Sequence, residues 1–378
     1  MRGSAHKLFV VVSFLLAGVS VSAGVTDHAV GVNVRPSFII PTHGFYNGWN
    51  PSGRTLRAGG TLDVQYSFSV DGSGAYQGAG AAVHTFFAHK LIGTPATIYI
   101  FQGAPLARLC DNLTFGYEWN LGLSAGWKNN GIVTVSPLNA YINVAALFTW
   151  QTGKHWEIIF GPEYTHFSNG DTMFPNGGAN TVNFRIGTRY HFNPQRVIQI
   201  EKIFAGCDEN RDLSRRFSYD LILSGGWRAD RYMQGNTLMI DNRAFPTALV
   251  CLNPSYVFNE YLSVGPALEY MYDSSANARY AFLSHSALGI SARAELRMPV
   301  FAVNIGAGYS FVMARPQNIV KPELHGLYGV FSLKAFVTSR IFLNISYRLS
   351  VVNYSHSLMY GIGYRFEKKM RPAEKPVP

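Results

Sequence analysis

The chain is dominated by segments in which apolar and polar residues alternate. The segment LDVQYSFSV at 62–70 places Leu, Val, Tyr and Phe on one side of an extended strand, and Asp, Gln and Ser on the other. NTVNFRIGTRYHF at 180–192 and LMYGIGYRF at 358–366 repeat the pattern. Because successive side chains of a strand point to opposite faces, this period of two predicts strands with one apolar face each.

The length of these segments and their aromatic ends favour a membrane barrel over a soluble sandwich. A sandwich buries its apolar face, whereas a transmembrane barrel turns that face to lipid and its polar face to the lumen. Segments of about 9 to 12 residues suit tilted strands that cross a bilayer, and Tyr, Trp and Phe at their ends are typical of aromatic girdles. We therefore predict an all-β, antiparallel transmembrane β-barrel of the outer-membrane type.

The barrel orientation can be stated for one strand. In the segment 180–192 we expect Val182, Phe184, Ile186 and Tyr190 outside. The arginines between them, Arg185 and Arg189, should then face the lumen.

Fifteen segments carry the strand pattern. Because bacterial barrels of this class close with an even number of strands, we expect about 14, with 12 and 16 open. The charged stretch 193–216 is interpreted as a long loop within a single barrel over 24–366, and two small barrels remain the alternative. The segments are near 28–39, 62–70, 79–90, 112–125, 139–150, 156–168, 180–192, 217–228, 246–258, 261–272, 284–296, 299–311, 325–337, 341–350 and 356–366.

The N-terminus predicts export. A basic start is followed by the apolar run LFVVVSFLLAGV and by small residues up to Ala23, so residues 1–23 are expected to be a cleaved signal peptide. After Ala23 no apolar run is long enough for a transmembrane helix, and we expect the mature protein in the outer membrane of a Gram-negative cell. Residues 367–378 form a basic tail.

Composition agrees with an exported membrane protein. The chain has 378 residues, 14% aromatic and only 14% charged, with a formal charge of +10. For an exported chain the expected acidic partner is phosphate-bearing lipid at a membrane surface, and nucleic acid is not expected. Three cysteines, Cys110, Cys207 and Cys251, are too few for a disulfide framework, and their pairing is left open.

One stretch, GPEYTHFSNGDTMFPNGGANTVNF, carries candidate chemistry. His166 and Ser168 are two residues apart and share the outer face of their strand, beside aromatic positions. A serine hydroxyl becomes a nucleophile when a base such as histidine takes its proton. Asn169 is a candidate oxyanion donor, and Asn180, in phase with Val182, is expected to come near His166 across the hairpin.

The complete motif resembles a known family. His-x-Ser-Asn-Gly, then Pro-Asn-x-Gly, then a polar residue at Asn180, resembles the lipid A 3-O-deacylase (PagL) or acyloxyacyl hydrolase-like family, best over 60–192. YEWNLGLSAGW at 117–127 is similar to its bacteroidete branch. The resemblance implies an outer-membrane enzyme that hydrolyses an ester-linked acyl chain of lipid A or lipopolysaccharide on its lipid-facing exterior, without a cofactor or metal. It implies Ser168 as nucleophile, His166 as base and Asn169 as oxyanion donor.

The chain departs from the family at two points. Asn180 stands where characterised members have a glutamate, and about 175 residues follow the motif strands as an extension without a counterpart. An amide oxygen can accept from the imidazole and hold its tautomer, but it carries no charge to stabilise the imidazolium. A non-enzymatic barrel with a degenerate site, such as a porin, and an outer-membrane phospholipase are therefore kept as alternatives.

Overall fold

The structure is a computed structural model. It describes residues 27–69, 75–133, 136–193, 217–234, 237–258, 261–275, 285–298, 301–312, 325–350 and 356–367. The expected signal peptide, Cys207, most of the stretch 193–216 and the tail beyond Glu367 lie outside these residues.

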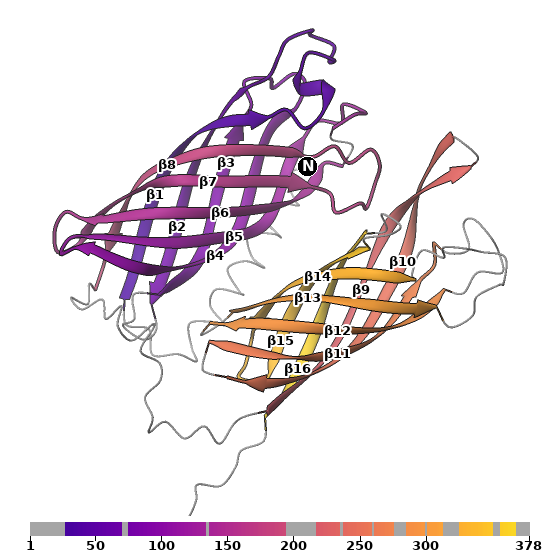
Figure 1. Cartoon of the computed structure of the whole chain (residues 1–378). Helices are drawn as coiled ribbons and strands as arrows, with labels where there is room; N and C mark the ends of the chain where they lie inside the picture. The colour runs from indigo at the N-terminus through magenta and orange to yellow at the C-terminus, as the bar shows by residue number, and fades with distance from the viewer. Residues whose placement is uncertain are drawn as a thin grey trace, which may run out of the picture. The chain divides into compact units, whose positions relative to one another are not determined.

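The first half of the chain forms a closed eight-stranded antiparallel barrel in which each strand pairs with its neighbours in sequence and β1 pairs with β8 (Figure 1). The connection between β1 and β2 contains the 3-10 turn η1 (Gly44–Tyr46). The strands are β1 (Asp27–Ile40), β2 (Ala58–Ser69), β3 (Tyr76–Thr85), β4 (Gly93–Cys110), β5 (Leu113–Trp127), β6 (Leu138–Gln151), β7 (Trp156–Ser168) and β8 (Ala179–His191).

The second half forms another closed eight-stranded barrel, in which β16 pairs with β9 (Figure 1). In the part of the chain that the structure describes, no helix has the length and apolar character needed to cross a membrane. The strands are β9 (Phe217–Gln234), β10 (Thr237–Val257), β11 (Leu262–Asp273), β12 (Ser286–Arg297), β13 (Phe301–Val312), β14 (Gly326–Phe336), β15 (Ile341–Ser350) and β16 (His356–Glu367).

The predicted fold class is confirmed, but the prediction of one barrel with about 14 strands is wrong. The sixteenth strand is β4, for which the sequence pattern predicted nothing. Its lumen-facing residues include Tyr99 and Phe101, which are 3% and 0% exposed, so the strand is apolar on both faces and does not alternate. Because aromatic side chains of β4 fill the lumen, the strand lacks the alternating pattern and was not predicted. With β4 included, the sixteen strands can form two barrels, each with an even number of strands.

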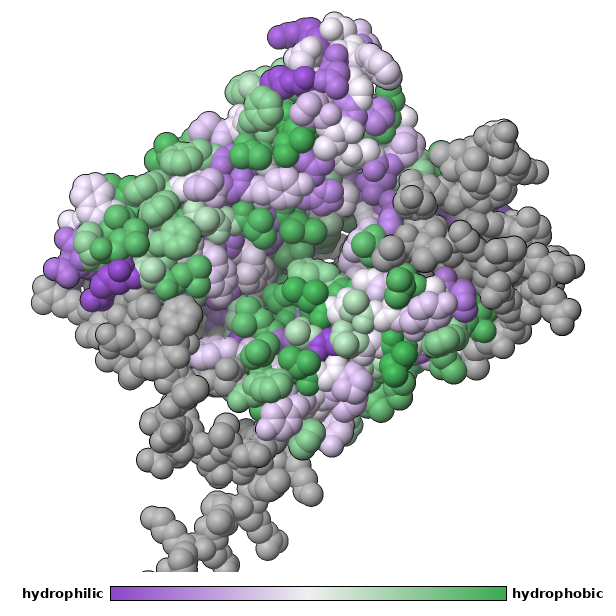
Figure 2. Space-filling model, viewed as in Figure 1, coloured by the Kyte–Doolittle hydropathy of each residue, from purple (hydrophilic) through white to green (hydrophobic). Residues whose placement is uncertain are grey.

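The exterior of the first barrel is apolar, as the register prediction requires. Val182, Phe184 and Ile186 are 46%, 45% and 53% exposed, whereas Arg185 and Arg189 are buried. Tyr190 is half-buried because its ring packs edge-on against Trp156 on the same outer face. Figure 2 shows apolar side chains gathered over the strands of each barrel. Such a surface is stable against lipid, where closure also leaves no unpaired strand edge.

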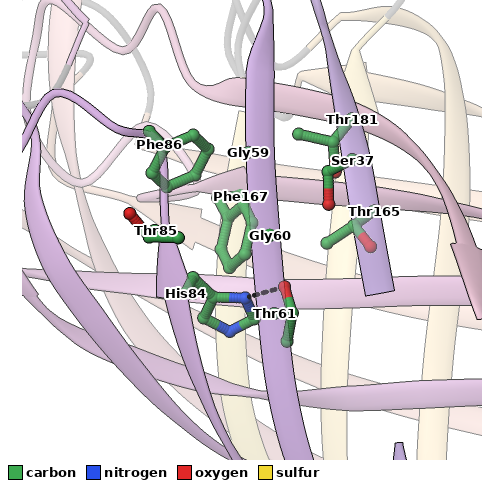
Figure 3. A pocket seen from close by; sticks show the side chains of 10 residues that line it. All are labelled: Ser37, Gly59, Gly60, Thr61, His84, Thr85, Phe86, Thr165, Phe167 and Thr181. Atoms are coloured by element: carbon green, nitrogen blue, oxygen red, sulfur yellow. Dashed lines mark hydrogen bonds between the residues drawn. The ribbon is translucent and has the colours of Figure 1, made fainter. Parts of the chain in front are cut away.

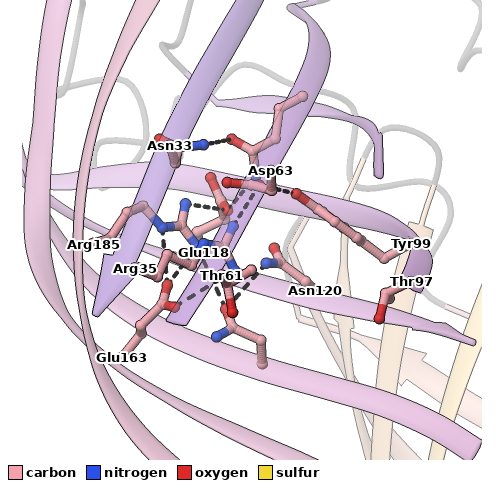
Figure 4. A network of polar contacts seen from close by, with 12 residues as sticks. Asn33, Arg35, Thr61, Asp63, Thr97, Tyr99, Glu118, Asn120, Glu163 and Arg185 are labelled. Atoms are coloured by element: carbon pink, nitrogen blue, oxygen red, sulfur yellow. Dashed lines mark hydrogen bonds and ion pairs between the residues drawn. The ribbon is translucent and has the colours of Figure 1, made fainter. Parts of the chain in front are cut away.

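The lumen of the first barrel is filled by an ion-pair network (Figure 4). Arg185 contacts Glu118 and Glu163 at 2.6 and 2.9 Å. Arg35 contacts Asp63 at 2.6 Å and Glu163 at 3.5 Å. All five side chains are essentially inaccessible to solvent, so each charge depends on its partners for compensation.

The lumen of the second barrel follows the same principle. Asp220 accepts from Arg365 at 2.7 Å and from Lys334 at 2.6 Å. Glu295 contacts the same two cations.

Two of the three cysteines lie in described residues. Cys251 is buried with a free thiol, and Cys110 carries an exposed free thiol at the end of β4.

The lumen network predicts the effect of removing one charge. Arg185→Leu should destabilise the first barrel by about 3–5 kcal/mol, because Glu118 and Glu163 lose their closest cation. Ile186→Leu, at the next position on the lipid-facing side, is the matched control and should leave stability near wild type. Urea titration of the full chain in lipid vesicles measures both, and equal midpoints for the two variants would contradict the account.

Candidate active site

The predicted site residues lie on one hairpin of the first barrel. β7 and β8 pair so that His166 stands directly opposite Asn180. Along β7 the even positions from Trp156 to Ser168 are exposed or half-buried, and the odd positions are buried. His166 and Ser168 therefore share the outer, lipid-facing surface, as the sequence predicted.

The imidazole of His166 is held by the side-chain amide of Asn180. Nδ1 of His166 and Oδ1 of Asn180 are 2.6 Å apart. An amide oxygen can only accept, so Nδ1 carries the proton and Nε2 is left with the lone pair that a general base needs. This tautomer is assigned from the hydrogen-bond partner.

Two further residues hold the amide in place. The Tyr164 hydroxyl donates to the same Asn180 oxygen at 2.6 Å, and Asn180 Nδ2 donates to Thr42 Oγ1 at 3.4 Å. The sequence reasoning missed both roles. Tyr164 was recognisable by its position two residues before His166 on the same face, but Thr42 comes from a loop 138 residues away in the chain.

The loop 41–57, which contains Thr42, has a buried apolar core and contacts the turn that precedes β8. The Tyr46 ring is buried in that core, and its hydroxyl donates to the Gly178 carbonyl at 2.7 Å, next to the start of β8. Burial raises the pKa of Tyr46, so the hydroxyl stays protonated as a donor. Gly178 has φ +61°, and a Cβ there would meet the Phe167 carbonyl at 2.7 Å, so the turn requires glycine.

Ser168 and Asn169 lie at the end of β7. Ser168 is half-buried on the outer face, and among the described residues its hydroxyl makes no hydrogen bond with His166. Such bonds often tighten only when substrate is bound. Asn169 is 5% exposed, and its backbone N–H donates to Asn176 Oδ1 at 3.1 Å, within the loop. Its oxyanion role stays a prediction.

A small polar pocket lies on the other side of the same wall (Figure 3). Thr165 and Thr181, which flank the site residues in sequence, point into it, and His84 is bound there by Thr61 and Thr97 at 2.8 Å each. Because it opens inside the barrel, this pocket is separate from the outward-facing hairpin. Among the described residues no cluster of His, Cys, Asp or Glu is arranged to hold a metal ion.

Comparison with solved structures gives barrels of low similarity. CdiB from Acinetobacter baumannii is 7% identical with a TM-score of 0.21, and the match covers 90% of this chain and 60% of CdiB. Omp33 from the same organism is 9% identical, with 90% and 99% covered and a TM-score of 0.18. An outer-membrane channel from Pseudomonas putida F1 is 10% identical, with 91% and 96% covered and a TM-score of 0.22. TM-scores this low carry no inference about function. A search of the curated proteins found no match.

The family comparison concerns the second barrel. Residues 217–369 match the model described as acyloxyacyl hydrolase, C-terminal domain. The expectation that this half is an extension without a counterpart is therefore wrong, since it is the half that the family model covers. The resemblance read from the motif lies in the other half, over 60–192. Residues 217–369 thus match the acyloxyacyl hydrolase-like (PagL) family that the motif around His166 resembles.

Proposed function

We propose that the first barrel is a lipid A deacylase of the outer membrane, which hydrolyses an ester-linked acyl chain with Ser168 as nucleophile and His166 as general base. The observation that carries the proposal is the 2.6 Å contact between His166 Nδ1 and Asn180 Oδ1 on the lipid-facing surface. It leaves Nε2 free to take a proton on the face where acyl chains lie. The match of residues 217–369 to an acyloxyacyl hydrolase domain supports hydrolysis of acylated lipid as the reaction class.

The reaction follows from these positions. Ser168 Oγ attacks the ester carbonyl carbon while its proton passes to His166 Nε2. The tetrahedral intermediate collapses as the bond to the sugar oxygen breaks and His166 returns the proton to that oxygen. Water, deprotonated by His166, then attacks the acyl–Ser168 ester and releases the fatty acid. Asn169 is the proposed donor to the oxyanion.

Asn180 has an orienting role in this scheme. Its oxygen keeps the proton of the imidazole on Nδ1, and Tyr164 and Thr42 hold the amide in that orientation. The amide is neutral, so it contributes less to the imidazolium than a carboxylate would. The rate is therefore expected to depend on Asn180 without being lost when Asn180 is removed.

Loss of either dyad residue should abolish activity. Ser168→Ala and His166→Ala should each lower the deacylation rate on the order of a thousandfold or more, and the double variant should be no slower than the single ones, because the residues act as a unit. Ser286→Ala, a serine beside a histidine in the second barrel, is the control and should retain full activity.

Mass spectrometry of lipid A from cells that produce each variant measures this outcome. Wild type should remove one hydroxy fatty acid from lipid A. Formation of lysophospholipid instead would indicate a phospholipase, and unchanged lipids with wild-type protein would indicate a non-enzymatic barrel. Near-normal activity in either single variant would overturn the assignment of the dyad.

Substitutions at Asn180 test the orienting role. Asn180→Ala should slow the reaction by about tenfold, the equivalent of one hydrogen bond of about 1.4 kcal/mol. Asn180→Glu should match or exceed wild type because a carboxylate also stabilises the imidazolium. Nitrogen NMR of the labelled imidazole should report Nδ1–H for His166 in wild type, and a different tautomer mixture in Asn180→Ala. Ile186→Ala, on the same outer face, should change neither quantity; full activity in Asn180→Ala would contradict the role.

A further inference from the structure

The end of the first barrel at which Ser168 lies is closed by four linked loops, called the serine rim here. The Tyr46 hydroxyl binds the Gly178 carbonyl, the Gly178 N–H binds the Val133 carbonyl at 3.2 Å, and the Lys128 N–H binds the Ile92 carbonyl at 2.8 Å. These bonds join each loop to the next. The described parts of these loops are 41–57, 86–92, 128–133, 136–137 and 175–178.

Below its surface the serine rim has a shared apolar core. Phe45 and Leu56 from the first loop pack in one cluster with Phe86 and Ile92 from the second and Val133 from the third. This core extends to Phe167, which lies between His166 and Ser168. The loops thus share one apolar core, and that core reaches the strand that carries the candidate site.

The serine rim is strongly cationic. Its described residues include Arg54, Arg57, Lys90 and Lys128, and none of them is an aspartate or a glutamate. Arg54, Lys90 and Lys128 are exposed. At the opposite end the described loops 111–112 and 152–155 contain Asp111 and Lys154, and the exposed Arg108 lies near them at the end of β4. The loops beside Ser168 therefore carry the larger excess of cations.

Arg54 and Lys90 are exposed, and among the described residues their side chains form no hydrogen bond or ion pair that would explain their presence. Arg57, by contrast, donates to the Tyr46 carbonyl and to Asn47 Oδ1, which explains its presence within its own loop. Exposed aromatic side chains accompany the exposed cations: Trp49 is 80% exposed and Phe87 is 69% exposed. In the upper loop of Figure 1, which precedes β2, the surface is largely hydrophilic in Figure 2. Cations interleaved with aromatics at the end of a lipid-facing barrel suit the interface between acyl chains and headgroups.

We infer that the serine rim binds the phosphate groups of a membrane lipid headgroup through Arg54, Lys90 and Lys128. Binding there would set the depth of an acyl ester against Ser168, because catalysis depends on positioning the reacting atoms. The inference rests on the proposed function for the substrate, but the binding of a phosphorylated lipid is measurable without turnover.

Binding is best measured with the full chain carrying Ser168→Ala, solubilised in a neutral detergent. The probes are bisphosphorylated lipid A and the same lipid after enzymatic removal of both phosphates. Each lysine or arginine near an anionic surface contributes about 1 kcal/mol, or roughly fivefold in affinity. Arg54→Gln with Lys90→Gln should therefore weaken binding of the phosphorylated probe about 10- to 30-fold and leave binding of the dephosphorylated probe unchanged.

Lys154→Gln, an exposed lysine at the opposite end, is the matched control and should bind like the parent protein. The inference is overturned if the double variant binds the phosphorylated probe as tightly as the parent, or if Lys154→Gln weakens binding equally. Displacement of the lipid by an equal concentration of inorganic phosphate would also overturn it, since the site would then be one for free phosphate. If binding depends on these charges but lipid A in cells is unchanged, the proposed deacylase activity is refuted. The inference that the serine rim binds phosphorylated lipid is then still supported.

Discussion

The partition of charge between the two faces of each strand is the constraint on which the structure depends. Against lipid, a charged side chain is costly unless it is paired, so the arginines and carboxylates in the middle of the strands turn inward. In the first barrel Arg185 lies between Glu118 and Glu163, and in the second barrel Lys334 lies between Asp220 and Glu295. The lumens are consequently filled with salt bridges and aromatic rings, and the exteriors are left apolar.

The candidate site is an exception to this partition because its polar side chains lie on the outer side of the barrel wall. His166, Ser168 and Tyr164 are polar groups on the outer surface, and Asn180 is buried against two of them. None of the four needs a permanent charge in the resting state. Asn180 is only 9% exposed, so a glutamate at this position would bury a carboxylate at a desolvation cost that an amide avoids. In the proposed mechanism Asn180 gives less electrostatic support to the imidazolium than a carboxylate would, but its burial costs less. Tyr164 and Thr42 hold the neutral amide in its orientation.

Alternation predicted the features that depend on the two faces of a strand, and little else. It placed Arg185 inward and Ile186 outward, and it placed His166 and Asn180 on one surface, because a period of two leaves only one alternative register. It missed β4, where Tyr99 and Phe101 fill the lumen with apolar groups, and so it miscounted the strands and expected one barrel. The contact of Thr42 with Asn180 was not predictable, because it depends on how a long loop folds back over its own apolar core. The motif resemblance drew attention to 60–192, whereas the family model matches 217–369.

The central claim is that Ser168 is an activated nucleophile on the lipid-facing surface. The most direct measurement is peptide mass mapping of the full chain after reaction with a long-chain alkyl fluorophosphonate, which modifies activated serines. The account predicts a phosphonyl adduct on Ser168 that disappears in His166→Ala. An unmodified Ser168, or an adduct that persists without His166, would contradict it.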